Sequence, residues 1–185
     1  MHVGMLRRSP VRLLGLFAVV AATLIVPLGA SSALAAAPRV GFGFHARDVS
    51  GFPTGSVSLT GGGAFDTNTL TIHAGGGFSC THEVDQLFLA GCLQGQGVRW
   101  DTDTVLASTG FKCTGAVTEA PKTATTGADT VVMQADFYRA GDANDESFTA
   151  QMIVSTRDLA GDIQGVQNVW VQGVGCGAAT VHFGA

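Results

Sequence analysis

Apolar and polar residues alternate along much of the chain after Pro38, and this two-residue period is typical of half-buried β-strands. The alternating runs are about five to seven residues long, and glycine clusters separate them, as is typical of all-β proteins. The first runs place apolar residues at Phe42 and Phe44, at Val57 and Leu59, and at Leu70, Ile72 and Ala74. The glycine runs at 61–63 and 75–77 are interpreted as two equivalent strand ends.

The clearest pair of strands lies on either side of the segment 140–146. In each strand every second residue is apolar, at Val131, Met133, Ala135 and Phe137, and then at Phe148, Ala150, Met152 and Val154. The intervening sequence Ala-Gly-Asp-Ala-Asn-Asp-Glu has the residue types of a turn. The pattern predicts a β-hairpin whose opposite face is mixed and meets solvent, with Val132, Gln134, Asp136, Tyr138, Thr149, Gln151, Ile153 and Ser155.

The remaining segments also favour strand over helix. A last strand is expected at 168–172, resuming at 179–183 after glycines 173, 175 and 177. Residues 102–108 and 157–166 are expected to hold a short helical turn at most, and 114–129 is predicted to be an exposed loop. About seven to nine strands in one domain predict a single antiparallel β-sandwich or a small closed β-barrel, and the sequence leaves both open.

The first 35 residues have the three parts of an export signal. Three arginines precede the apolar stretch 13–28, and a small-residue tail ends in Ala33-Leu34-Ala35. A 16-residue apolar stretch interrupted by Pro27 is short for the roughly 20 residues that span a bilayer. We therefore predict a cleaved signal peptide at 1–35, the general secretory pathway, a secreted all-β domain at 36–185, and no membrane association after cleavage.

Cleavage changes the charge of the working protein. The full chain has a formal net charge of −4. Removing Arg7, Arg8 and Arg12 from the ten basic residues leaves seven against fourteen acidic residues, a net charge of −7. This balance argues against nucleic acid and anionic lipid as partners. We expect a monomer that needs no cofactor and binds a small molecule, a glycan or a protein.

All four cysteines lie in the predicted mature domain, which indicates two disulfides in an oxidising compartment. Three pairings are possible, and we favour Cys80 with Cys92 and Cys113 with Cys176, because the first pair brackets one short loop. On the loop-entropy model the short ring contributes roughly 3 kcal/mol and the long ring roughly 4 kcal/mol. Zinc is disfavoured because C-x-x-C and H-x₃-H spacings are absent.

The segment 97–103 is the most site-like stretch of the sequence. On a strand, Arg99, Asp101 and Asp103 share one face, and Trp100 lies on the other. Two carboxylates beside an arginine suit acid/base catalysis if burial separates their pKa values. Arg99 and Trp100 are candidate ligand-binding residues. The favoured alternative is a surface ion-pair cluster with Trp100 in the core, because such pairs are common and weak.

Two further segments carry candidate residues. His82 and Glu83 lie in the loop between Cys80 and Cys92, where binding residues are often displayed, and His82 is a third catalytic candidate. G-x-S-x-G, S-x-x-K and H-E-x-x-H motifs do not occur, which disfavours the familiar serine and zinc hydrolases. Oxygen ligands at Asp142, Asn144 and Glu146 alternate as in calcium loops, but a solvated acidic turn is favoured because the EF-hand pattern is incomplete.

Four segments, 44–48, 97–102, 135–139 and 166–170, resemble a group of small exported β-rich proteins of uncharacterised function from high-GC Gram-positive bacteria. The resemblance implies a compact secreted domain and assigns no catalytic residue. The leading hypothesis is a secreted binding or surface-interaction module. The alternatives are an extracellular acid/base hydrolase or isomerase, which requires a deep pocket gathering Arg99, Asp101 and a histidine, and a structural component of the cell envelope.

Overall fold

The computed structural model describes residues 39–53, 55–140 and 147–184. They belong to one compact unit, Ala36–Ala185. The predicted signal peptide and the acidic turn with the calcium-ligand candidates Asp142, Asn144 and Glu146 lie outside the described residues. Within the described ranges, no helix has the length and apolar character needed to cross a membrane.

The described residues form strands and one short 3₁₀ helix. In chain order these are β1 (Val40–Gly51), β2 (Ser56–Asp66), β3 (Thr71–His82), η1 (Leu87–Leu89), β4 (Arg99–Leu106), β5 (Ser108–Phe111), β6 (Lys122–Thr125), β7 (Thr130–Tyr138), β8 (Phe148–Ser155), β9 (Val169–Val171), β10 (Gly175–Gly177) and β11 (Ala179–Gly184). Residues 102–106 thus continue a strand, and the predicted loop 114–129 contains β6.

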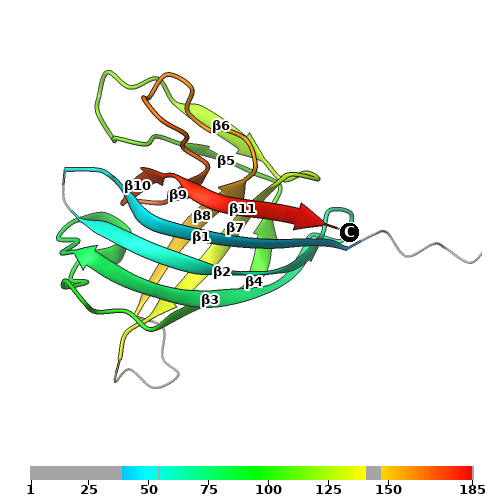
Figure 1. Ribbon diagram of the computed structural model, residues 1–185, viewed down its shortest axis with the longest axis horizontal. Coiled ribbons are helices and arrows are strands. Elements are labelled where there is room, and N and C mark those ends of the chain that lie inside the picture. The colour runs from blue at the N-terminus through cyan, green and yellow to red at the C-terminus, as the bar shows by residue number, and fades with distance from the viewer. Residues whose placement is uncertain (1–38, 54, 141–146, 185) are drawn as a thin grey trace, which may run out of the picture. The chain divides into compact units, whose positions relative to one another are not determined.

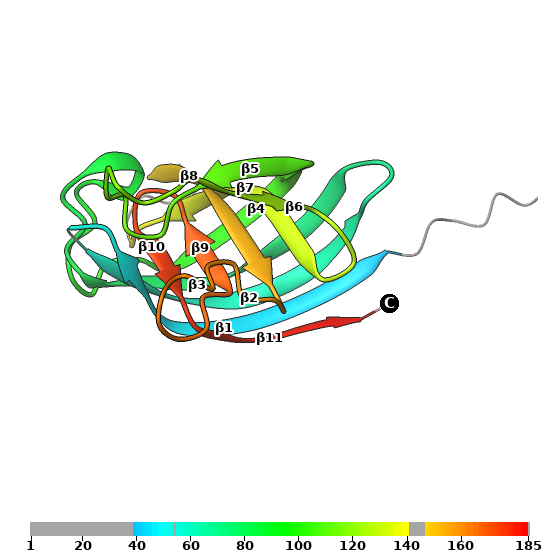
Figure 2. The ribbon, with the colours of Figure 1, turned by 90° about the horizontal axis from the view of Figure 1, so that it is seen from above.

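The main sheet closes on itself as a barrel. Its order is β10-β9-β8-β7-β4-β3-β2-β1-β11, and β10 also pairs with β1 through Ser50–Cys176 and Gly51–Gly175. All neighbours are antiparallel, and from β1 to β10 they follow one another in the chain, apart from the inserted β5–β6 hairpin. The pairings of β1 with β10 and β11 join the two ends of the chain. Figures 1 and 2 show β1–β3 on one side and β7–β9 on the other. The predicted antiparallel all-β fold is confirmed, and the β10–β1 pairing makes it an up-and-down barrel.

The predicted hairpin is confirmed residue by residue. In the β7–β8 register Val131 pairs with Val154, Met133 with Met152, Ala135 with Ala150, and Phe137 with Phe148. Because side chains alternate between the two faces of a strand, these pairs all point into the barrel. Seven of the eight are buried, and Phe148 packs against the core while partly exposed.

Large side chains fill the barrel interior. Phe78 and Phe137 meet edge to face at 5.0 Å, and Phe44 packs against Trp100 with ring centres 5.9 Å apart. Trp100 is 1% exposed and donates its indole N–H to the Thr60 carbonyl at 3.1 Å. An eight-stranded barrel is just wide enough for side chains to fill. The surface offered to a ligand is therefore the outside of the barrel.

The glycine runs lie in the middle of β2 and β3, so the interpretation as strand ends is wrong. Gly61 pairs with Gly76 and Gly62 with Gly75. A Cβ atom at Gly61 would lie 2.6 Å from Cζ2 of Trp100. Glycine is required here because two strand backbones approach closely around a large indole ring.

A second apolar cluster lies on the outer face of β7–β9. Val132, Ile153 and Trp170 form its floor, and Phe111 of β5 and Ala124 of β6 cover it. The predicted solvent exposure of this hairpin face is therefore wrong at Val132 and Ile153, because the β5–β6 hairpin covers them. The disulfide Cys113–Cys176 connects the segment after β5 to β10, and Cys80–Cys92 closes the predicted short loop. Both predicted pairings are confirmed.

Candidate functional site

The charged candidates of β4 form an exposed ion pair on the outside of the barrel. Arg99 and Asp101 are bonded to each other, with side chains 41% and 42% exposed. Tyr138, opposite Arg99 on β7, lies under the guanidinium at 3.7 Å and donates its hydroxyl to Asp101 Oδ1 at 3.1 Å. Burial and this hydrogen bond raise the pKa of the Tyr138 hydroxyl. Exposed pairs of this kind contribute at most about 1 kcal/mol.

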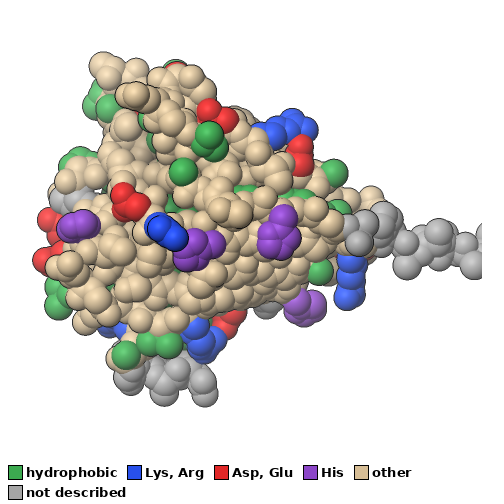
Figure 3. All heavy atoms as spheres, in the orientation of Figure 1, with side chains coloured by type: hydrophobic (Ala, Val, Ile, Leu, Met, Phe, Trp, Pro, Cys, Tyr) green, Lys and Arg blue, Asp and Glu red, His purple; other side chains and the backbone are tan. Residues whose placement is uncertain are grey.

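The other sequence candidates lie apart from this pair. Trp100 points into the core, and the side chain of Asp103 is outside what the structure describes. The hydrogen-bond partner of His82 is Ser56, whose Oγ lies 2.7 Å from Nδ1, and Glu83 is exposed at the start of the disulfide loop. Figure 3 shows the histidine side chains of this face as separate groups. The structure thus joins Arg99 to Asp101 but does not bring His82 to them.

The Cys80–Cys92 loop is held firmly and displays two apolar side chains. The Val84 N–H donates to the Cys92 carbonyl at 2.9 Å, and the Gly91 N–H donates to the Val84 carbonyl at 2.7 Å. Leu89 and Val84 are fully buried and anchor the loop. Leu87 and Phe88 face outward, with 55% and 48% of their surfaces exposed.

Leu87 has a left-handed backbone conformation, with φ of 65°. For a residue other than glycine this conformation costs roughly 1–2 kcal/mol. Next to it, Gly173 in the turn between β9 and β10 has φ of +80°, and a Cβ atom there would lie 2.9 Å from Cβ of Leu87. Gly173 therefore lets the disulfide loop lie directly on the β9–β10 turn.

An apolar groove runs between this loop and the β5–β6 cover. We call it the loop groove; its volume is about 340 Å³, and it is lined by Phe52, Leu87, Phe88, Gly110, Phe111, Lys112, Pro121, Trp170, Gln172 and Gly173. Phe111 and Trp170, which are 4% and 3% exposed, pack with ring centres 5.6 Å apart. The Trp170 indole donates to the Lys112 carbonyl at 2.9 Å. Aromatic walls with few polar groups are typical of ligand sites.

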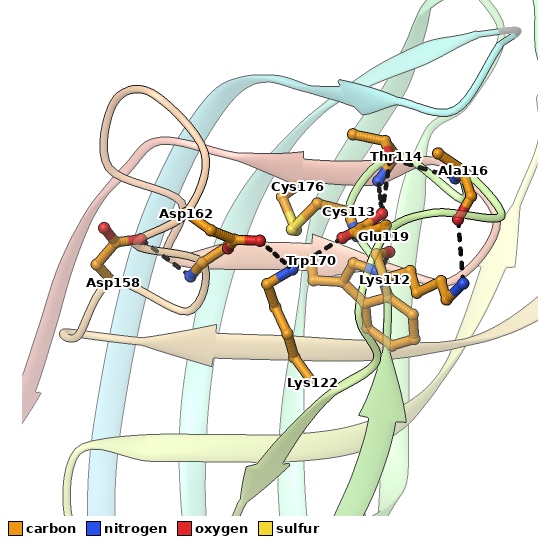
Figure 4. Close-up of polar contacts among 11 residues, drawn as sticks. Lys112, Cys113, Thr114, Ala116, Glu119, Lys122, Asp158, Asp162, Trp170 and Cys176 are labelled. Atoms are coloured by element: carbon orange, nitrogen blue, oxygen red, sulfur yellow. Dashed lines mark hydrogen bonds and ion pairs between the residues drawn. A yellow bond between two sulfur atoms is a disulfide. The ribbon is translucent and has the colours of Figure 1, made fainter.

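A buried carboxylate fixes the chain segment beyond Lys112. Glu119 accepts hydrogen bonds from the N–H groups of Cys113 and Thr114 at 2.7 and 2.8 Å, and from the Thr114 hydroxyl at 2.6 Å. Lys122 bridges Glu119 and Asp162 at 3.0 Å each. Figure 4 shows this network beside the Cys113–Cys176 bridge and Trp170. It holds one wall of the loop groove in place.

Acid is expected to weaken this network. Burial raises the pKa of Glu119, but the hydrogen bonds from Thr114, Cys113 and Lys122 outweigh it and lower the pKa from 4.5 to about 2. A carboxylate with a lowered folded pKa stabilises the fold above pH 4.5 and loses that contribution as the pH falls toward 2. Glu119→Gln should lose about 2 kcal/mol at pH 7, because buried hydrogen bonds to a charge are lost.

Urea unfolding at pH 7 and at steps down to pH 2 measures both effects. The variant should show a smaller acid-induced loss than the original chain. Asp162→Asn is the matched control, because the Asp162 side chain is 57% exposed and should contribute little. Equal stability of Glu119→Gln and the original chain at pH 7 would contradict this role.

The sequence suggested no site at the residues that line the loop groove, apart from the disulfide loop that carries two of them. The polar residues His82 and Glu83 suggested a site in that loop, whereas it displays Leu87 and Phe88 to the groove. The useful signal was the run Leu87-Phe88-Leu89 inside a short disulfide-closed loop, where apolar residues need a partner. Among the described residues, no group of three or more His, Cys, Asp or Glu side chains could hold a metal.

Comparisons of the chain with protein-family models, with curated proteins and with solved structures find no match.

Proposed function

We propose that this chain is a secreted, disulfide-stabilised binding module that recognises a partner protein through the loop groove. The observation that carries the proposal is the rigid display of Leu87 and Phe88 beside an aromatic groove, with Leu87 in a conformation that costs energy. Clustered exposed apolar side chains mark interaction sites. Backbone strain at an exposed position is also typical of ligand-binding segments.

The lining of the loop groove indicates the chemistry of the partner. Its walls suit one or two aromatic or aliphatic side chains, which are the usual anchors of protein interfaces. Among the described residues that line the groove, Lys112 is the charged one. Its ammonium donates to the Ala116 carbonyl at 3.0 Å and has further N–H donors for a ligand. We infer a peptide segment with an apolar anchor next to a carboxylate.

Secretion is supported by the two disulfides, which form in oxidising compartments, and by the predicted signal peptide at 1–35. The filled barrel interior directs recognition to the outer surface. The enzyme hypothesis draws less support from the geometry, because Asp101 is exposed and bonded to Arg99 and Tyr138.

Peptide selection tests the proposed function. A randomised phage-displayed library is panned on the purified domain 36–185, with unbound phage recovered from the Phe88→Ser variant as counter-selection. Enriched peptides should carry an aromatic or aliphatic residue near Asp or Glu. Their affinity should fall at least about tenfold, or about 1.4 kcal/mol, in Phe88→Ser.

Leu93→Ser is the matched control, because Leu93 is 47% exposed and does not line the loop groove. Peptides should bind this variant as tightly as the original domain. Failure to enrich any sequence, or equal binding to Phe88→Ser, would overturn the proposal.

A further inference from the structure

Within the described residues, one edge of the main sheet has no neighbouring strand. β10 pairs with β1 on one side and with β9 on the other, whereas β11, the next strand, has β1 as its one partner among the described strands. Figures 1 and 2 show β11 beside β1 at this edge. The barrel seam is therefore closed at β10 and open along β11.

At Ala179, the first residue of β11, the side chain of Asn168 takes the place of a neighbouring strand. Its Oδ1 accepts the Ala179 N–H at 2.7 Å, and its Nδ2 donates to the Ala179 carbonyl at 3.0 Å. The Asn168 amide thus supplies to Ala179 the acceptor and the donor that the backbone of a neighbouring strand would supply. These two bonds also show that the backbone polar groups of Ala179 point away from β1.

The orientation of the Ala179 backbone N–H and C=O groups determines the orientation of these groups in the rest of β11. β11 keeps an unbroken antiparallel register with β1 from Ala46–Ala179 to Gly41–Gly184. Because backbone groups alternate sides along a strand, the N–H and C=O groups of Val181 and Phe183 also point away from β1. In the described part of the chain these two donors and two acceptors have no protein partner.

The side chains of β11 suit strand addition. Val181 and Phe183 pack against the core but stay half-buried, and Phe183 stacks on Phe42 with ring centres 5.8 Å apart. Thr180 and His182 are exposed. The strand Ala-Thr-Val-His-Phe-Gly contains no Lys, Arg, Asp, Glu or Pro, the residues that usually protect sheet edges from pairing.

We propose that β11 is a strand-addition site and that its occupant is β11 of a second copy of this chain. Antiparallel pairing of Val181 with Phe183 of the second copy, and the reverse, gives four backbone hydrogen bonds across a two-fold axis. This register pairs the outward backbone groups of Val181 and Phe183, and it keeps the hydrogen bonds between Asn168 and Ala179. Because β11 contains no Lys, Arg, Asp or Glu, two paired copies of the strand place no such charges against each other. The two copies share one continuous sheet, in place of the monomer that the sequence suggested.

In this two-fold register, one residue lies opposite the same residue of the second copy. His182 lies opposite His182 of the second copy on the outer face, with Cβ atoms about 4.5–5.5 Å apart. Like charges placed at this position repel, and opposite charges attract. A charge exchange at residue 182 therefore tests whether the two copies of this residue lie next to each other.

Sedimentation equilibrium of the purified domain 36–185 over a range of concentrations tests the proposal. The domain should form a dimer, and Val181→Pro should raise the dissociation constant at least about tenfold, because proline removes an outward N–H that β1 does not use. Thr180→Ala should dimerise normally. Thermal unfolding of each variant establishes that the barrel is intact.

His182→Glu and His182→Lys should each weaken the dimer, and an equimolar mixture should form a heterodimer of at least the original affinity. A monomeric original domain would overturn the proposal. So would a dimer that neither Val181→Pro nor the charge variants affect, because it would use another surface.

Discussion

Gly76→Ala is expected to destabilise the barrel by about 3 kcal/mol or more, whereas Gly77→Ala should change stability by less than about 0.5 kcal/mol. A Cβ atom at Gly76 would lie 1.9 Å from the Thr60 carbonyl oxygen and 2.5 Å from Cα of Gly61. At Gly77 the nearest atom would be Cγ2 of Thr60, at an ordinary 3.5 Å. The two glycines are neighbours in β3 but differ in what their Cβ atoms would meet.

Urea unfolding of the two variants measures the difference in the free energy of unfolding. A large loss for Gly76→Ala alone would support the close approach of β2 and β3 around Trp100. Equal losses for the two variants would contradict this close approach, because they would reflect a general cost of replacing glycine with alanine in β3.

Removal of the long disulfide is the second large effect. Cys113→Ala with Cys176→Ala should lower the free energy of unfolding by about 4 kcal/mol, following the entropy of a long closed loop. It should also loosen the β5–β6 cover, because Cys113 directly follows Phe111 and Lys112 over Trp170. The expected signal is a red shift of tryptophan fluorescence under native conditions, from exposure of Trp170.

Cys80→Ala with Cys92→Ala is the matched control. This pair closes the shorter ring and should cost about 3 kcal/mol. Its loss should shift the fluorescence of the folded protein less than loss of the long bridge, since the β5–β6 cover stays on Trp170 and Trp100 is in the barrel core. A red shift in the control and none in the Cys113/Cys176 variant would contradict the assignment of the cover to the long bridge.

Local patterns in the sequence predicted the strands better than their arrangement. Alternation predicted the β7–β8 pairing because every second residue of both strands faces one core. Barrel closure depends on Ser50 meeting Cys176, and no local pattern reports a contact between residues so far apart. The strand at 102–106 and the strand β6 were missed for a related reason, because their polar residues become strands only by pairing with neighbours.

The candidate site was harder to predict than the fold. Charged residues suggest chemistry in a sequence, so Arg99 and Asp101 stood out, although they form an exposed pair. The loop groove is built mainly from apolar residues of distant segments, such as Phe52, Leu87 and Trp170, which the sequence cannot bring together. The sequence suggested a site in the Cys80–Cys92 loop at His82 and Glu83, and the apolar run Leu87-Phe88-Leu89 was the signal that could have indicated the groove.

The most direct test of the loop groove as the recognition surface is calorimetric titration of a selected peptide against Leu87→Gly, with the melting temperature of the variant measured alongside. Glycine relieves the left-handed strain at φ of 65° and removes the exposed side chain. We predict a melting temperature within a few degrees of the original domain's, because relieved strain offsets the added freedom of the unfolded chain. Peptide affinity should fall at least about tenfold. Unchanged affinity in a folded Leu87→Gly domain would contradict the assignment of function to this surface.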